Sequence, residues 1–165
     1  MTKKNTLIAI GLILNTFLTW AQDVINAPMQ TRWGKEVTAQ NVWQEYPRPQ
    51  LERKEWLNLN GQWDYAIVKK DQESPEGFQG KILVPFAVES SLSGVTKTVA
   101  PDEKVWYSRV FDIPREWGGK KILLHFDAVD WETKVWLNGK EVGSHRGGSD
   151  PFTFDITSYV KNGEQ

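Results

Sequence analysis

Three acidic residues stand close together in the sequence, at Asp127, Asp130 and Glu132. Carboxyl groups in a pair can act as general acid and general base, provided that burial or a like charge raises the pKa of one of them. These three residues follow a predicted strand and occupy the turn after it, and no neighbouring feature predicts such a shift. We therefore expect none of them to be catalytic.

His125 and His145 are the only histidines, and there is no cysteine. A zinc site needs three or four ligands, and no spacing in this sequence supplies them. His125 stands in an apolar run and is predicted to be a core residue with its hydrogen bonds satisfied. The sequence thus predicts neither a metal nor a cofactor.

Other catalytic signatures are missing as well. The glycine pairs at residues 118–119 and 147–148 are typical of hairpins, because no strand-to-helix context surrounds them as in a phosphate-binding loop. The sequence contains no G-x-S-x-G nucleophile elbow and no internal repeat. Function must therefore be sought in binding surfaces, and these depend on the elements that position them.

About seven short strands are predicted, with turn signals between them and no long helix. An almost unbroken apolar run at residues 122–126 predicts a central strand covered on both faces. Asn138-Gly139 is the strongest hairpin signal, and residues 87–104 are predicted to form a long loop. The pattern favours an all-β fold, a sandwich or jelly roll. The predicted strands cover residues 63–67, 81–86, 106–113, 122–126, 133–137, 141–145 and 152–156.

Residues 1–21 are typical of a secretory signal, with Lys3 and Lys4 before an apolar run and Ala21 at the expected cleavage point. An uncleaved anchor is the alternative. After cleavage we expect no membrane span, and the protein is predicted to be exported to a bacterial periplasm, the cell surface or the medium. Residues 22–50 are predicted to form an extended lead-in segment.

The composition limits the classes of binding partner that we expect. The formal net charge is −1, which gives no electrostatic reason to expect nucleic acid or an anionic membrane. Nine tryptophans occur in 165 residues, eight of them after residue 21. Indole rings stack on sugar rings but also fill the cores of β-sandwiches, so most are expected in the core. A tryptophan-rich exported β domain still favours carbohydrate as the partner.

Several short motifs, in this order and spacing, resemble one known module. The sequence is similar to the N-terminal sugar-binding domain of the family 2 glycoside hydrolases, which include β-galactosidases, β-glucuronidases and β-mannosidases. The resemblance implies a galactose-binding-like jelly-roll β-sandwich over residues 51–165, expected to lack its last strand or strands. The motifs are Y-P-R-P at Tyr46, W-L-N-L-N-G-Q-W at Trp56, V-P-F at Val84, W-Y-S-R at Trp106, L-H-F-D-A-V-D-W at Leu124 and G-G-S-D-P-F at Gly147.

The resemblance also implies candidate sugar contacts. Asp102 stands where some family members have a sugar-contacting Asn or Asp; the alternative is a solvated turn residue. Arg146 offers a fork of donors for a carboxylate or a hydroxyl pair; the alternative is a surface ion pair. Asp150 is a third candidate, or simply a turn former before Pro151. Gly147 replaces an acidic residue of some β-galactosidases, and the segment is closer to the glucuronidase pattern.

In the family, an immunoglobulin-like domain and a (β/α)₈ barrel follow, and the barrel carries both catalytic glutamates. The resemblance therefore implies a non-catalytic domain of an enzyme that hydrolyses O-glycosyl bonds, with a role in shaping the barrel's sugar pocket. Retaining glycosidases need two carboxyl groups about 5–5.5 Å apart, and both are expected beyond Gln165. A free-standing carbohydrate-binding module and a structural β-sandwich are the alternatives.

Overall fold

The computed structural model describes residues 29–161, and the predicted signal at residues 1–21 lies outside them. This part of the chain folds into seven strands and four short 3₁₀ helices. Between residues 29 and 161, no helix has the length and apolar character needed to cross a membrane. The helices are η1 (Gly34–Glu36), η2 (Pro49–Leu51), η3 (Ser91–Ser93) and η4 (Arg115–Trp117). The strands are β1 (Gly61–Lys69), β2 (Gly80–Val84), β3 (Glu103–Ser108), β4 (Leu123–Phe126), β5 (Glu132–Leu137), β6 (Lys140–Arg146) and β7 (Phe152–Asp155).

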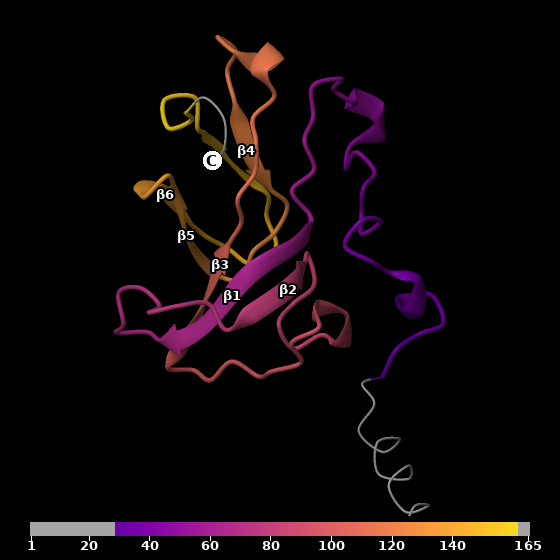
Figure 1. The fold of residues 1–165 in the computed structure, drawn as a ribbon, viewed down its shortest axis with the longest axis vertical. Helices are drawn as coiled ribbons and strands as arrows, with labels where there is room; N and C mark the ends of the chain where they lie inside the picture. Colours follow the sequence, from indigo (N-terminus) through magenta and orange to yellow (C-terminus); the bar gives the residue numbers. More distant parts are fainter. Residues whose placement is uncertain (1–28, 162–165) are drawn as a thin grey trace, which may run out of the picture.

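All strand pairings are antiparallel. One sheet has the order β2-β1-β3, and two further pairs are β4-β7 and β5-β6. In Figure 1 the three-stranded sheet lies in front of the β5-β6 pair. Antiparallel strand pairs, with no long helix in residues 29–161, confirm the predicted all-β class.

The middle of β1 is covered on both faces. Alternation of Trp63, Tyr65 and Ile67 with Asp64 and Ala66 predicts a half-buried strand, and Tyr65 is indeed buried. Ala66, on the opposite face, is also buried, at 0 % exposure. It pairs in register with Trp106 of β3.

The start of β1 is fixed by Arg109, which follows β3. Its Nη1 donates hydrogen bonds to the carbonyl oxygens of Leu59 and Asn60, both at 3.0 Å. Gly61 has φ +123°, and a Cβ there would lie 3.1 Å from the same Nη1, so this turn requires glycine. Partial burial lowers the pKa of Arg109, but an arginine remains charged at neutral pH.

Two strands differ from their predictions. The strand predicted at residues 106–113 is β3, which begins at Glu103 and ends at Ser108. Its ladder with β1 includes polar residues that a hydrophobic pattern does not mark. The prediction that residues 122–126 form a doubly covered central strand is wrong. Within residues 29–161, β4 pairs only with β7, and Leu123 is 39 % exposed while Leu124 packs inward.

The β5-β6 hairpin confirms its sequence signal. Asn138 and Gly139 form the turn with φ of 52° and 77°, the positive values that a two-residue hairpin with a right-handed twist requires. The Asn138 side-chain amide also donates to the carbonyl oxygen of Tyr159 at 3.0 Å. The turn residue thus ties the hairpin to the segment after β7.

Two clusters of buried side chains form most of the core in residues 29–161, beside Val42, Ala66 and Phe152. The β1–β2 cluster consists of Tyr65, Ile82 and Val88. The β4–β7 cluster consists of Ile122, Leu137 and Ile156. Ile82 and Ile156 are the most enclosed large side chains, at 0 % and 1 % exposure, so each cluster has one isoleucine at its centre.

The tryptophans depart from the prediction that most of them pack in the core. Of the tryptophans between residues 29 and 161, only Trp63 and Trp117 pack against the clusters. Trp136 lies in the row of β5 side chains that alternation turns outward, where Trp106 stacks on it with ring centroids 5.0 Å apart. Four tryptophans are exposed: Trp33 (63 %), Trp43 (67 %), Trp131 (59 %) and Trp136 (40 %).

Residues 29–50, the described part of the lead-in segment, lie along one side of the strands (Figure 1). Val42 is its buried anchor, at 2 % exposure. Side-chain hydrogen bonds hold it at two points: the Asn58 amide donates to the Trp43 carbonyl at 2.7 Å, and the Ser91 hydroxyl donates to the Met29 carbonyl at 2.9 Å. The domain boundary at residue 50 stays a prediction.

Candidate functional site

Asp102 lies in the turn that leads into β3. Its Oδ2 accepts a hydrogen bond from Lys69 Nζ at 2.9 Å, and the same ammonium lies 3.4 Å from Glu103 Oε1. The hydrogen bond between Asp102 and Lys69 lowers the pKa of the aspartate and raises that of the lysine. The main-chain oxygen of Asp102 accepts from Lys70 N at 2.9 Å. Asp102 is thus an exposed, charged carboxylate fixed at the end of β1.

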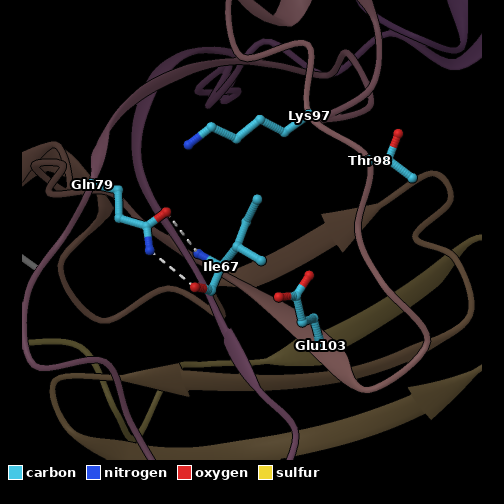
Figure 2. A pocket seen from close by; sticks show the side chains of 5 residues that line it. All are labelled: Ile67, Gln79, Lys97, Thr98 and Glu103. Atoms are coloured by element: carbon cyan, nitrogen blue, oxygen red, sulfur yellow. Dashed lines mark hydrogen bonds between the residues drawn. The ribbon is translucent and has the colours of Figure 1, made fainter.

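An open hollow of about 390 Å³ lies beside this turn. Figure 2 shows Lys97 and Glu103 on opposite sides of Ile67, with Gln79 bonded to the Ile67 main chain. The lining consists of Ile67, Gln79, Lys97, Thr98 and Glu103. None of these residues has an aromatic ring, so this part of the structure offers no stacking platform for a sugar.

Gln79 lines one wall of the hollow, and its side-chain amide makes the hydrogen bonds that the main chain of a neighbouring strand would make. Its main-chain N donates to the Tyr65 carbonyl at 2.8 Å. Its side-chain Oε1 then accepts from Ile67 N at 3.3 Å, and its Nε2 donates to the Ile67 carbonyl at 2.9 Å. These are the two bonds that a facing residue makes in an antiparallel ladder. The Gln79 amide therefore covers the edge of β1 where β2 has not yet begun.

Replacing Gln79 by alanine is expected to speed hydrogen exchange at the Ile67 amide and to cost about 1 kcal/mol of unfolding free energy, because two hydrogen bonds are lost. Exchange measured by NMR or mass spectrometry tests this. Gln72→Ala is the matched control: its amide donates only to Ser74 O within the neighbouring loop, and we expect less than about 0.5 kcal/mol. Unchanged exchange at Ile67 in the Gln79 variant would contradict the assignment.

Arg146 ends β6 on its exposed face. Its Nη2 donates to Glu132 Oε1 at 2.9 Å, the residue opposite it in the β5-β6 ladder. Its guanidinium carbon also lies 5.6 Å from the centroid of the Trp131 ring, within the range of a cation–π contact. The surface ion pair that the sequence leaves as an alternative is therefore present, and it does not bury the guanidinium, whose side chain is 68 % exposed.

Asp150 lies beside His145. Its Oδ2 is 3.1 Å from His145 Nε2, an ion-pair distance whose angles fall outside those of a hydrogen bond. The imidazole ring stacks on Phe152 with centroids 4.2 Å apart, which fixes its orientation. The Asp150 side chain is 61 % exposed, so part of the carboxylate faces solvent.

These residues belong to one constellation, the loop cluster, which we define as residues 130–132 together with 145–150. Gly147 N donates to the Trp131 carbonyl at 2.8 Å and so joins the two segments. A Cβ on Gly147 would collide with the Asp150 carboxylate, and one on Gly148 with the Asp130 carboxylate. Glycine at both positions lets two carboxylates approach the same stretch of main chain.

The structure brings two of the three predicted contact residues together. Arg146 and Asp150 share the loop cluster, but no hydrogen bond or ion pair within residues 29–161 links either to Asp102. Sequence reasoning missed Trp131 as a site residue, although an aromatic residue between two acids at a strand's start was a usable signal. It also missed Lys69, because neither the residue type nor its position in the sequence signalled a role in the site.

The remaining candidates are not assembled into a reaction centre. Glu132 is engaged by Arg146, and residues 29–161 hold no group of three His, Asp or Glu side chains placed to bind a metal. The prediction of His125 as a core residue is wrong: its ring is exposed, bonds the Thr153 hydroxyl at 2.8 Å and stacks on Trp56. Partial burial and the nearby Arg48 and Arg53 lower its pKa.

Comparisons with known proteins show which family and which proteins this chain is similar to. Residues 82–165 match the family model described as glycosyl hydrolases family 2, sugar binding domain. A β-glucuronidase of Paenibacillus borealis is 31 % identical over 126 residues, which cover 73 % of this chain and 21 % of that protein. A β-galactosidase of Thermoanaerobacter pseudethanolicus is 47 % identical over 58 residues, which cover 35 % of this chain and 8 % of that protein.

Among solved structures, a Bifidobacterium dentium β-glucuronidase complexed with coumarin-3-O-glucuronide is 31 % identical, with a TM-score of 0.51 over 64 % of this chain and 18 % of that one. A Faecalibacterium prausnitzii β-glucuronidase is 30 % identical, with a TM-score of 0.51 over 65 % of this chain and 19 % of that one. These likenesses confirm the predicted jelly-roll β-sandwich. The chain spans about a fifth of the length of the first curated relative. With its family model matched over more than half of its residues, the chain belongs to glycosyl hydrolase family 2, through that family's sugar-binding domain.

Proposed function

We propose that this chain is the non-catalytic sugar-binding part of an exported family 2 glycoside hydrolase, which hydrolyses O-glycosyl bonds in carbohydrate metabolism. One observation carries the proposal: residues 82–165 match the sugar-binding domain, while the chain spans only 21 % of a relative named β-glucuronidase. An immunoglobulin-like domain and a TIM barrel with the catalytic glutamates complete the enzyme. The isolated chain therefore binds or positions substrate without cleaving it.

The role of the domain is to narrow the sugar pocket of the barrel. A TIM barrel's site is open at the carboxyl ends of its strands, and a domain docked there lends loop residues to one side of the pocket. Asp102 and the pair Arg146 and Asp150 are the residues we assign to this wall. All three are exposed, and Asp102 and Arg146 are already held by Lys69 and Glu132, so these two lose little side-chain order on contact. Asp150 lies 3.1 Å from His145 Nε2.

The 165-residue chain is expected to show no hydrolysis of chromogenic β-galactosides or β-glucuronides, whereas protein expressed from the reading frame extended beyond Gln165 cleaves at least one of them. Retaining chemistry needs the barrel's paired glutamates. Replacing one of those glutamates by glutamine in the longer protein is the control and should abolish turnover. Turnover by the 165-residue chain that disappears in Asp127→Asn or Glu132→Gln would refute the assignment.

Export is the second part of the proposal, and it rests on the sequence of residues 1–21. We expect the mature protein to begin at Gln22 and to be found in a bacterial periplasm, at the cell surface or in the medium. Fractionation with amino-terminal sequencing tests this. A protein that keeps Met1 in the cytoplasmic fraction would remove export from the proposal.

A free-standing carbohydrate-binding module is the second candidate. The exposure of Trp33 (63 %) and Trp43 (67 %) favours it, because both indoles are open to a sugar ring. The cation–π contact of Arg32 with Trp33, at 4.3 Å, covers only one ring face. An open reading frame that ends near residue 165 would favour this candidate over the enzyme domain, whereas a continuation into a barrel would exclude it.

A further inference from the structure

The loop cluster holds one exposed indole beside polar groups that are free to bind. Trp131 is 59 % exposed, a value too high for a ring that is covered on both faces. The Arg146 guanidinium lies near one face, 5.6 Å from the ring centroid. With the residue 59 % exposed, indole surface remains for a ligand, and the apolar C–H face of a pyranose ring is a natural partner for it.

A free carboxylate stands next to this ring. Asp130 precedes Trp131 directly and is exposed, and no hydrogen bond or ion pair within residues 29–161 uses its carboxylate. It approaches Gly148 so closely that a side chain there would displace it. A carboxylate accepts hydrogen bonds only, and adjacent sugar hydroxyls are donors of suitable spacing.

Arg146 supplies the complementary donors. It bonds Glu132 through Nη2, which leaves further guanidinium N–H groups for a ligand oxygen. The Gly147 N–H bonds the Trp131 carbonyl and fixes the main chain beneath the indole. Aromatic face, acceptor and donor therefore stand together on a backbone that is already ordered.

The charged side chains of the loop cluster determine which class of sugar it can bind. Within the loop cluster, three carboxyl side chains, Asp130, Glu132 and Asp150, outnumber the one guanidinium of Arg146. A sugar carboxylate would be repelled there, because charges within a Debye length of about 8 Å interact at physiological salt. The cluster thus suits a ligand with hydroxyl groups and no charge.

We propose that Trp131, Asp130 and Arg146 form a binding surface for a neutral hexopyranoside, which acts on the domain itself and does not require a barrel. The surface would hold a neutral sugar unit of a larger carbohydrate, although named relatives of the chain are β-glucuronidases. The inference deepens the proposed function by naming a ligand class, but it is tested on the 165-residue chain alone.

The test is a titration of the 165-residue chain with methyl β-galactopyranoside, methyl β-glucopyranoside and methyl β-glucuronide, followed by NMR of the indole N–H signals. We expect a dissociation constant on the order of 1–10 mM for at least one neutral glycoside, with the Trp131 signal moving most. The glucuronide should bind at least about 3-fold more weakly, and this difference should shrink at 0.5 M salt as screening increases.

Variants locate the surface. Trp131→Ala should weaken binding of the neutral glycoside at least about 10-fold, and Asp130→Asn about 3-fold, in the range of aromatic anchors and single polar contacts. Phe78→Ala is the control, since that ring is exposed at 49 % outside the loop cluster, and it should leave the affinity unchanged. Trp43→Ala tests the indole of the second candidate function. If Trp131→Ala fails to fold, the indole shifts of the unaltered chain still identify the ring.

Three results would overturn the inference: no saturable binding of any neutral glycoside up to 100 mM (roughly ten times the weakest expected constant), tighter binding of the glucuronide, or loss of binding in Trp43→Ala instead of Trp131→Ala. None of these bears on whether the extended reading frame encodes an active glycosidase. Conversely, an inactive extended protein would leave a sugar bound at Trp131 unaffected. The two proposals therefore fail independently.

Discussion

Replacing Gly143 by valine is expected to lower the free energy of unfolding by about 3 kcal/mol, the upper part of the range for overpacked sites. A Cβ at Gly143 would lie 2.6 Å from Phe154 Cε1 and 3.1 Å from Cδ1. The Phe154 ring cannot easily withdraw, because it packs against the β4–β7 cluster and lies edge-on to Phe152 at 5.7 Å. Urea unfolding followed by tryptophan fluorescence measures the change.

Ser144→Val is the control for this prediction. It introduces the same side chain one residue further along β6, on the exposed face. We expect it to lower the free energy of unfolding by less than about 0.5 kcal/mol. Combining Gly143→Val with Phe154→Leu should recover part of the loss, since the two sites are in contact and their effects do not add. Equal midpoints for Gly143→Val and the unaltered chain would show that the ring and the strand are not packed as described.

Replacing Ile82 by alanine is expected to cost about 3–4 kcal/mol, because the side chain is fully enclosed and the surrounding groups cannot collapse completely into the space. Ile82 has 0 % exposure at the centre of the β1–β2 cluster. Its neighbours Tyr65 and Val88 come from β1 and from the loop after β2. The variant should therefore loosen the contact of that loop with the sheet.

The comparison for Ile82 is Val110→Ala, which removes two methyl groups from a side chain that is 60 % exposed. We expect a change below about 0.5 kcal/mol, measured in the same urea titration. A second comparison, Ile156→Ala, probes the other cluster at 1 % exposure and should cost a similar amount to Ile82→Ala. A loss below about 1 kcal/mol for both isoleucines would contradict two packed clusters.

Local signals in the sequence predicted the strands and turns well. Asn138-Gly139 forms its hairpin because few other residue pairs accept positive φ at both positions, and the alternation of residues 152–156 gives β7. Errors arose where a strand's neighbours decide the outcome. An apolar run at residues 122–126 is equally compatible with one covered face or two, and only the observed pairing with β7 separates them.

The candidate site was harder to predict than the fold. The resemblance to a family pointed to Asp102, Arg146 and Asp150, yet the partners that hold them are distant in sequence: Lys69 is 33 residues from Asp102. Glu132 meets Arg146 only through the register of the hairpin. Trp131 was overlooked because composition favours placing indoles in a core, whereas strand alternation and the loop geometry leave this ring in solvent.

The Gln79 amide has a practical consequence for remodelling the molecule. Because this side chain is bonded to both main-chain groups of Ile67, the hairpin between β1 and β2 is clamped at its base. Changes in the number of residues between Asp71 and Gly77 should then leave the strand register intact, since loop length alone adds little cost. That stretch is the natural place to graft an epitope or a fluorescent reporter.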